Sequence, residues 1–362
     1  MRTVAKSLSM LVNTALLVML GGLFLIVGKP VLLPILAAVI TVYLIVSASE
    51  ALGRVPVIGR LPAALRRGLV LLAFAIALMV LTGVVVGTIS QIVTQAPTYQ
   101  ANIEKLVAQI AEAVGVDERP DWPTIRAATF GRFSLQALIN TSLLNVTSLG
   151  AAAFLVIIYS AFLMAERANF SRKLSLALRD PSDAARTEAI IRDINDRIGD
   201  YLAIKTLVNV ILGGFSYFIL WMLDVDFPLF WALAIGMLNY IPYFGSLVGV
   251  ALPVVLSVVQ FGDLGRTILL GVLLTTAQVT VGSVLEPRLI GRRVNLSPFI
   301  VLVSLAVWSG LWGLAGALLA VPLTSMLTIV LSAFEPTRPV AILMADRIAG
   351  DPATGPHKEH AP

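Results

Sequence analysis

Long apolar runs alternate with short polar segments along most of the chain. An α-helix needs about 20 apolar residues to cross the hydrocarbon core of a bilayer. Six runs have roughly that length and predict single membrane spans: residues 10–27, 31–47, 69–89, 149–165, 202–223 and 267–285. Two later runs, residues 227–259 and 298–333, are longer and are interrupted by proline and glycine. We therefore predict about eight transmembrane segments, two of them broken or hairpin-like in the C-terminal half.

Composition supports this reading. Of the 362 residues, 58% are hydrophobic and only 13% are charged, and the mean hydropathy is +0.91. Globular domains are about 45–50% apolar and about 25% charged. The predicted fold class is therefore an all-α, polytopic integral membrane protein, with the lipid bilayer as its surroundings.

The same pattern predicts five parts. They are a three-helix transmembrane block (1–90), an extracytoplasmic amphipathic segment (91–148), a fourth span with a charged cytoplasmic helix (149–200), a C-terminal transmembrane core with broken helices (201–335), and a cytoplasmic polar tail (336–362). Four arginines at residues 50–67 and three at residues 288–293 place those loops and both termini in the cytoplasm. The net charge of +5 is thus explained by orientation, and no nucleic-acid partner is expected.

Two polar segments predict helices beside the membrane. Apolar residues recur at helical spacing in residues 103–114, which predicts an amphipathic helix acting either as a lid or as a solvated cap. Residues 117–123 predict a turn-rich break after it. In the charged segment, Ser182 or Asp183 is expected to cap a helix that leads into the fifth span.

The chain is organised around the stretch 239–253, where an apolar run is broken. Pro242 cannot donate a backbone hydrogen bond, and Gly245 and Gly249 let another backbone or a ligand come close. Broken helices point to the substrate site of a transporter. A second stretch with Gly313, Gly316 and Pro322 follows a loosely similar order, as an inverted repeat would. The substrate-path candidates are Asn239, Pro242, Gly245, Gly249, Gln278, Gly313 and Gly316.

The sequence offers little for an enzyme. It has no cysteine, and its two histidines, His357 and His360, lie in the polar tail. Neither a nucleotide-binding loop nor a hydrolase or metalloprotease motif is present. We therefore expect no catalytic residues, no metal site and no cofactor.

Three charged residues near the cytoplasmic ends of spans are candidates for ion coupling or ion pairing: Glu286, Arg288 and Lys205. Pro287 is expected to end the helix at Glu286, which would then need a cation partner or a bound proton. Neighbouring arginines, Arg288 first, are the expected partners, while Lys205 is expected to extend toward the cytoplasm.

Three late motifs carry a family resemblance. They are Asn-Tyr-Ile-Pro-Tyr-Phe-Gly-Ser at 239–246, Glu-Pro-Arg-Leu-Ile-Gly at 286–291, and Gly-Leu-Trp-Gly-Leu-Ala-Gly at 310–316. Together they resemble the AI-2E family of autoinducer-2 exporter-like permeases, over roughly residues 11–334. The resemblance implies a protein of the bacterial cytoplasmic (inner) membrane that transports a small solute. It also implies a homo-oligomer, with a pentamer as the expected assembly.

Three functions fit these features. The first is a secondary transporter or exporter of a small polar solute, which is autoinducer-2-like by resemblance. The second is a Na⁺/H⁺ (cation/proton) antiporter, for which Glu286 is the motivation. The third is a non-transporting membrane scaffold that recruits partners through the charged segment at 166–200.

Overall fold

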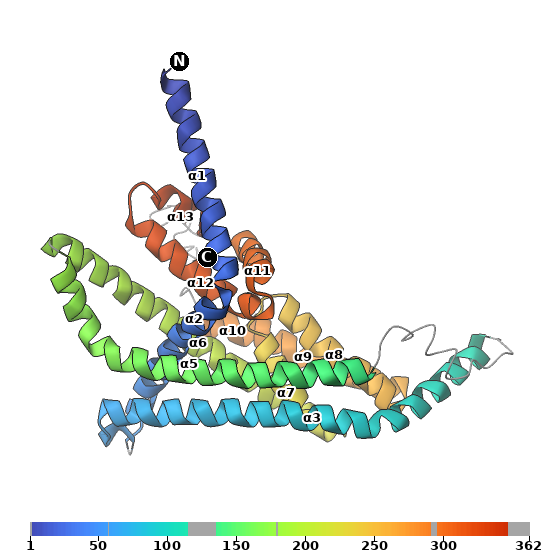
Figure 1. The fold of residues 1–362 in the computed structure, drawn as a ribbon. Coiled ribbons are helices and arrows are strands. Elements are labelled where there is room, and N and C mark those ends of the chain that lie inside the picture. The colour runs from blue at the N-terminus through green and yellow to red at the C-terminus, as the bar shows by residue number, and fades with distance from the viewer. Residues whose placement is uncertain (1, 57, 115–134, 179, 291–294, 347–362) are drawn as a thin grey trace, which may run out of the picture. The chain divides into compact units, whose positions relative to one another are not determined.

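The structure is a computed structural model that describes residues 2–56, 58–114, 135–178, 180–290 and 295–346. Within these ranges every regular element is a helix, which confirms the all-α prediction (Figure 1). The main helices are α1 (Arg2–Val27), α2 (Lys29–Gly53), α3 (Ala63–Val114), α5 (Leu135–Ala177), α6 (Pro181–Met222), α7 (Pro228–Leu238), α8 (Phe244–Phe261), α9 (Leu264–Thr280), α10 (Glu286–Ile290), α11 (Pro298–Trp312), α12 (Leu314–Ala333) and α13 (Arg338–Met344). A 3₁₀ turn, Ile58–Arg60, precedes α3, and a π-helical turn, Val281–Leu285, joins α9 to α10.

Seven helical stretches of the described chain are long and apolar enough to cross a membrane. They are Lys29–Gly53, Ala63–Ile92, Gly150–Arg167, Ala184–Met222, Phe244–Phe261, Leu264–Leu289 and Leu314–Ala333. Shorter apolar helices cover Ala15–Val27, Pro228–Leu238 and Pro298–Trp312. The prediction of a polytopic helical membrane protein is thus confirmed, and the two long interrupted runs are each split into a shorter and a longer helix.

The chain forms two compact units. One consists of Met1–Tyr43, Leu155–Ile198 and Val294–Pro362, and the other of Leu44–Phe154 and Gly199–Arg293. We call them the α11–α12 unit and the α7–α8 unit, after the broken helix pair that each contains. Because the chain passes between them within α2, α5 and α6, both units combine segments that are far apart in the sequence.

Several helices are longer than the apolar pattern predicts. The third span and the amphipathic helix form one continuous helix, α3, with Pro97 inside it. The charged segment likewise continues into the fifth span as α6.

The predicted cap of α6 is wrong, because Asp180 takes that role: its Oδ1 accepts from the backbone N–H and the hydroxyl of Ser182, each over 2.8 Å. These hydrogen bonds lower the pKa of the Asp180 carboxyl. The predicted break at residues 117–123 lies outside the described residues.

The core of the α7–α8 unit lies where α6, α7 and α9 meet. Fully buried aliphatic side chains of all three helices form it, including Val208, Leu212, Ile235, Leu270 and Leu274. Glycine allows α6 and α7 to approach closely. A Cβ on Gly236 would lie 3.0 Å from the Asn209 carbonyl oxygen, and one on Gly213 would lie 3.2 Å from that of Ala232. Small residues at such crossings are typical of membrane helices.

The first broken helix is a hairpin whose two ends lie together. α7 has 11 residues, or about 16 Å at 1.5 Å per residue, and is too short to cross the bilayer. At the base of the hairpin, the Asp226 N–H donates to Gln260 Oε1 over 2.8 Å, and Gln260 Nε2 donates to the Asp224 carbonyl over 2.7 Å. The start of α7 and the end of α8 therefore lie together at the base of the hairpin.

The tip of this hairpin is the predicted break at residues 241–245. Tyr243 has a φ of 62°, which is a conformation that costs energy for a residue with a side chain. The N–H groups of Phe244 and Gly245 are satisfied locally, by the carbonyls of Pro242 at 2.6 Å and Ile241 at 3.0 Å. The broken backbone is thus closed by its own hydrogen bonds, as a low-dielectric surrounding requires.

The second broken helix lies in the α11–α12 unit and turns at Gly313. That glycine has a φ of 65° and ψ of −143°, a conformation that essentially only glycine adopts. The expectation that Pro322 also interrupts this run is wrong, because Pro322 lies buried inside α12. Membrane helices tolerate such a proline where neighbouring groups take up the freed carbonyl.

The segment after α12 is more structured than a polar tail. α13 packs back toward the start of α11, where the Ser297 N–H donates to the Met344 carbonyl over 3.0 Å. The remaining tail, with His357 and His360, lies outside the described residues.

Candidate functional site

Amide side chains form a hydrogen-bonded chain beside the break between α7 and α8. Asn239 follows α7 directly, and its Nδ2 donates to Asn209 Oδ1 of α6 over 2.8 Å. Gln278 of α9 donates from Nε2 to Asn239 Oδ1, also over 2.8 Å. An amide both donates and accepts, so this chain can bind hydroxyl and carbonyl groups of an uncharged solute.

Two atoms of the amide chain lack a partner. Gln278 Oε1, an acceptor, and Asn209 Nδ2, a donor, are both buried and have no hydrogen bond within the described part of the protein. A buried carbonyl oxygen in this state costs about 1–3 kcal/mol. A polar ligand or a water molecule that donated to Gln278 Oε1 would recover that energy.

Two hydroxyl groups extend the polar cluster along α6. The hydroxyls of Thr206 and Tyr240 lie 2.6 Å apart, and Thr206 also reaches the Leu202 carbonyl at 2.7 Å. Tyr240 belongs to the break itself, one residue after Asn239. Neither Thr206 nor Tyr240 stands out in the sequence as a site residue, because a hydroxyl in an apolar run usually bonds to its own helix.

An ion pair between a buried lysine and a partly buried glutamate lies next to the amides. Lys205 Nζ and Glu286 Oε1 are 2.5 Å apart, and the two side chains are 6% and 23% exposed. Lys205 precedes Asn209 by one helical turn, so both share one face of α6. Lys205 therefore does not extend into solvent as expected, and the partner that the structure gives Glu286 is Lys205 rather than the expected Arg288, which is exposed.

The backbone at Glu286 also differs from the prediction. Pro287 does not end the helix, because the π-helical turn at Val281–Leu285 precedes it and the chain continues as α10. The Glu286 N–H donates to the Val281 carbonyl, five residues back. The wider turn makes room for the proline ring, which would clash with a carbonyl in a regular α-helix. π-turns of this kind occur frequently at functional sites.

The glycines of the first break pack against α7. A Cβ on Gly245 would lie 1.7 Å from the Leu238 carbonyl oxygen, whereas one on Gly249 would lie 3.5 Å from Ile235 Cα. Pro242, at the tip, is partly buried. Of the substrate-path candidates, Asn239, Pro242, Gly245, Gly249 and Gln278 thus belong to one unit, while Gly313 and Gly316 belong to the other.

The base of the hairpin carries a further set of contacts with α3. The Tyr99 hydroxyl lies 2.8 Å from Asp226 Oδ2, and Asn102 Nδ2 donates to the Gln260 carbonyl over 2.5 Å. Burial, followed by the hydrogen bond and charge of Asp226, raises the pKa of Tyr99. The first part of the predicted amphipathic segment is therefore attached to the hairpin base.

A helical membrane protein with a broken helix and hydrogen-bonded amides beside the break has the features of a membrane transporter. The family model described as AI-2E family transporter matches residues 14–335. The chain therefore belongs to the AI-2E transporter family, and it is a multi-pass protein of the bacterial inner membrane.

Named relatives support the family and differ in what their names say. A "Putative transport protein" of Borreliella burgdorferi is 29% identical over 67% of this chain and 66% of its own length. One from Haemophilus influenzae is 26% identical over 79% of this chain and 83% of its own length. The "AI-2 transport protein TqsA" of Escherichia coli K12 is 26% identical over 79% of this chain and 82% of its own length.

Proposed function

We propose that this chain is a secondary transporter of a small polar solute, and that the amide chain at the tip of the α7–α8 hairpin binds the solute. The observation that carries the proposal is the buried Gln278 Oε1, an acceptor without a partner in the described structure. Donors and acceptors alternate along Asn209, Asn239 and Gln278, which suits a solute with several hydroxyl groups.

We further propose that the solute resembles autoinducer-2. Three features support this proposal: the resemblance to the family, the name of the TqsA relative, and an amide site that offers hydrogen bonds without requiring charge. A small, uncharged, hydroxylated furanone would match such a site better than a strongly charged metabolite would.

The amide site is tested with Gln278→Met, which keeps an unbranched side chain and removes both polar atoms. We expect uptake or efflux of autoinducer-2 in proteoliposomes to fall at least about fivefold, the equivalent of about 1 kcal/mol of lost binding. Thr276→Val is the matched control, because the Thr276 side chain is exposed on the same helix and bonds to the Val272 carbonyl at 2.7 Å. Wild-type flux in Gln278→Met, at unchanged thermal stability, would show that the amide is structural.

The second candidate is cation/proton antiport, which the Lys205–Glu286 pair favours. A carboxylate that exchanges a lysine partner for a proton or Na⁺ could couple ion binding to movement of the hairpin. In inverted vesicles, antiport would then depend on a Na⁺ or pH gradient with no organic solute present. Solute flux that does not depend on either the Na⁺ or the pH gradient would favour a uniporter or exporter instead.

We also propose that both termini and the Asp180 turn face the cytoplasm, while the base of the α7–α8 hairpin faces outward. Because the chain has no cysteine, single cysteines report accessibility directly. Ser182→Cys should react with an impermeant maleimide only in opened cells. Leu264→Cys, at an exposed position directly after the hairpin, should react in intact cells. The opposite pattern would invert the topology.

A further inference from the structure

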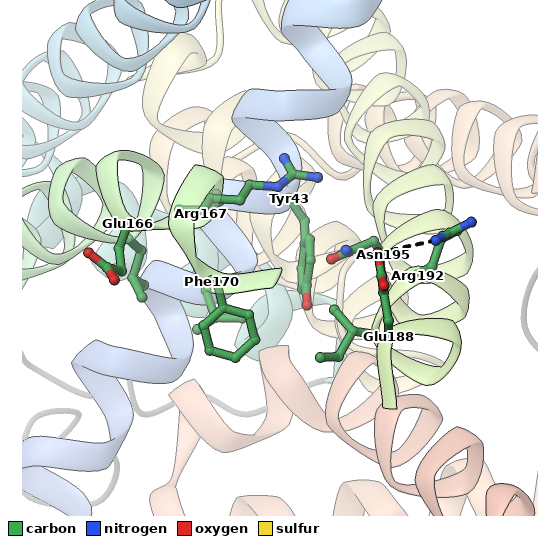
Figure 2. A pocket seen from close by; sticks show the side chains of 11 residues that line it. Tyr43, Glu166, Arg167, Phe170, Glu188, Arg192 and Asn195 are labelled. Carbon is green, nitrogen blue, oxygen red and sulfur yellow. Dashed lines mark hydrogen bonds and ion pairs between the residues drawn. The ribbon is translucent and has the colours of Figure 1, made fainter. Parts of the chain in front are cut away.

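A cavity of about 370 Å³ lies in the α11–α12 unit and belongs to neither broken helix. Residues of α2, α5 and α6 line it (Figure 2). The apolar part comes from Val39, Val42, Leu163, Phe170 and Ile191, and the polar part from Tyr43, Glu166, Arg167, Glu188, Arg192 and Asn195. Its volume is within the range of about 300–1,000 Å³ that is typical of small-molecule sites.

The charges around the cavity are unevenly paired. Glu166 forms an ion pair with Lys173, and Glu188 forms one with Arg192 over 3.3 Å. Arg167 has no carboxylate partner within the described ranges. In Figure 2 its side chain extends toward Tyr43, while Glu166 points away from Tyr43. The cavity therefore presents one guanidinium that is free to bind an anion.

The position of Arg167 along α5 indicates where such an anion comes from. Glu166 and Arg167 are the first charged residues after the apolar run of α5, so the guanidinium lies where a membrane span meets the polar headgroup region. Four aliphatic side chains and Phe170 make up the apolar part of the lining. The cavity thus combines apolar side chains with a cation at the depth of the lipid headgroups. This combination matches a phospholipid, whose phosphate would contact the cation while an acyl chain contacts the apolar side chains.

We propose that this cavity binds an anionic phospholipid. The phosphate lies on the Arg167 guanidinium, where a bidentate hydrogen bond is available. Tyr43 and Asn195 line the same cavity and offer a hydroxyl and an amide to other polar groups of the lipid, and an acyl chain covers Val39 and Phe170. This site is independent of the amide site proposed for the transported solute, which belongs to the other unit.

Native mass spectrometry of the full-length protein in detergent tests the proposal, with dioleoyl phosphatidylglycerol and dioleoyl phosphatidylcholine as probes. We expect tighter binding of phosphatidylglycerol, and an apparent affinity about tenfold weaker in Arg167→Gln, or about 1.4 kcal/mol. Arg197→Gln is the matched control: Arg197 is an exposed α6 arginine in an ion pair with Asp193 and does not line the cavity. It should bind phosphatidylglycerol as the wild type does.

Two further binding measurements test whether the anion belongs to a lipid and whether the positive charge of Arg167 binds it. Arg167→Lys should bind phosphatidylglycerol more tightly than Arg167→Gln but more weakly than the wild type, because a lysine offers a cation to phosphate without the bidentate hydrogen bond. Glycerol 3-phosphate, which has the headgroup chemistry without acyl chains, should not compete at millimolar concentration. Competition by glycerol 3-phosphate would contradict the proposal of a phospholipid and would indicate that the cavity binds a soluble phosphate compound. Equal binding of both lipids, unchanged in Arg167→Gln, would overturn the anion site altogether.

Discussion

Glu286→Gln and Lys205→Met should each destabilise the protein by about 3 kcal/mol, while the double variant should recover most of that loss. Glu286→Gln leaves the buried Lys205 without its carboxylate, Lys205→Met leaves the partly buried Glu286 without its cation, and breaking a buried pair typically costs about 3–5 kcal/mol. The two atoms are 2.5 Å apart, and the Lys205 side chain is only 6% exposed. Replacing both charges removes the desolvation cost together with the attraction.

Thermal unfolding in detergent measures the effect as a double-mutant cycle. The exposed Arg197–Asp193 pair is the control, because its atoms are 2.6 Å apart but its side chains are 53% and 42% exposed. Arg197→Gln should cost less than about 1 kcal/mol. Additive losses in the Lys205–Glu286 cycle would mean that the two residues act separately.

Flux measurements on the same variants separate structure from coupling. If the pair is only structural, the stabilised double variant should transport like the wild type. If Glu286 couples an ion, the double variant should be stable and yet show flux that no longer depends on the Na⁺ or pH gradient. We expect the second result, because an ion pair beside the amide site is placed to respond to the bound solute.

The break in the first hairpin could be predicted because its cause is local. Proline and glycine within a few residues of one another interrupt a helix wherever the chain places them. The apolar runs likewise predicted the spans, since the bilayer fixes their length. Helix ends were harder to predict from the apolar pattern. α3 and α6 each continue as one helix from the apolar span into a neighbouring polar segment.

The partner of Glu286 could not be predicted, because it is 81 positions away along the chain. The nearest cations in sequence were the only ones that local reasoning could offer. One signal was present: Lys205 and Asn209 are four residues apart in an apolar span, so their side chains had to share a face. A polar face on one membrane helix requires polar partners elsewhere, and Glu286 of α10 and Asn239, directly after α7, supply them.

Gly245→Ala should have the largest effect of any methyl added to the hairpin. The new Cβ would lie 1.7 Å from the Leu238 carbonyl oxygen, and a backbone atom cannot swing aside as a side-chain end can. The hairpin tip would have to open, with the loss of its local hydrogen bonds. We expect at least about 3 kcal/mol of destabilisation, the upper end of overpacking costs, together with loss of transport.

Gly249→Ala is the matched control, one helical turn further along α8. Its Cβ would make ordinary contact with Ile235 Cα at 3.5 Å, and alanine is about 1 kcal/mol better than glycine inside a helix. This variant should be as stable as the wild type or more so. The second broken helix offers a parallel pair of variants, because a Cβ on Gly316 would lie 1.9 Å from the Trp308 carbonyl oxygen, while one on Gly310 would meet no atom within 4 Å. Equal melting temperatures for Gly245→Ala and Gly249→Ala in detergent would show that the hairpin tip is not packed as tightly as this geometry requires.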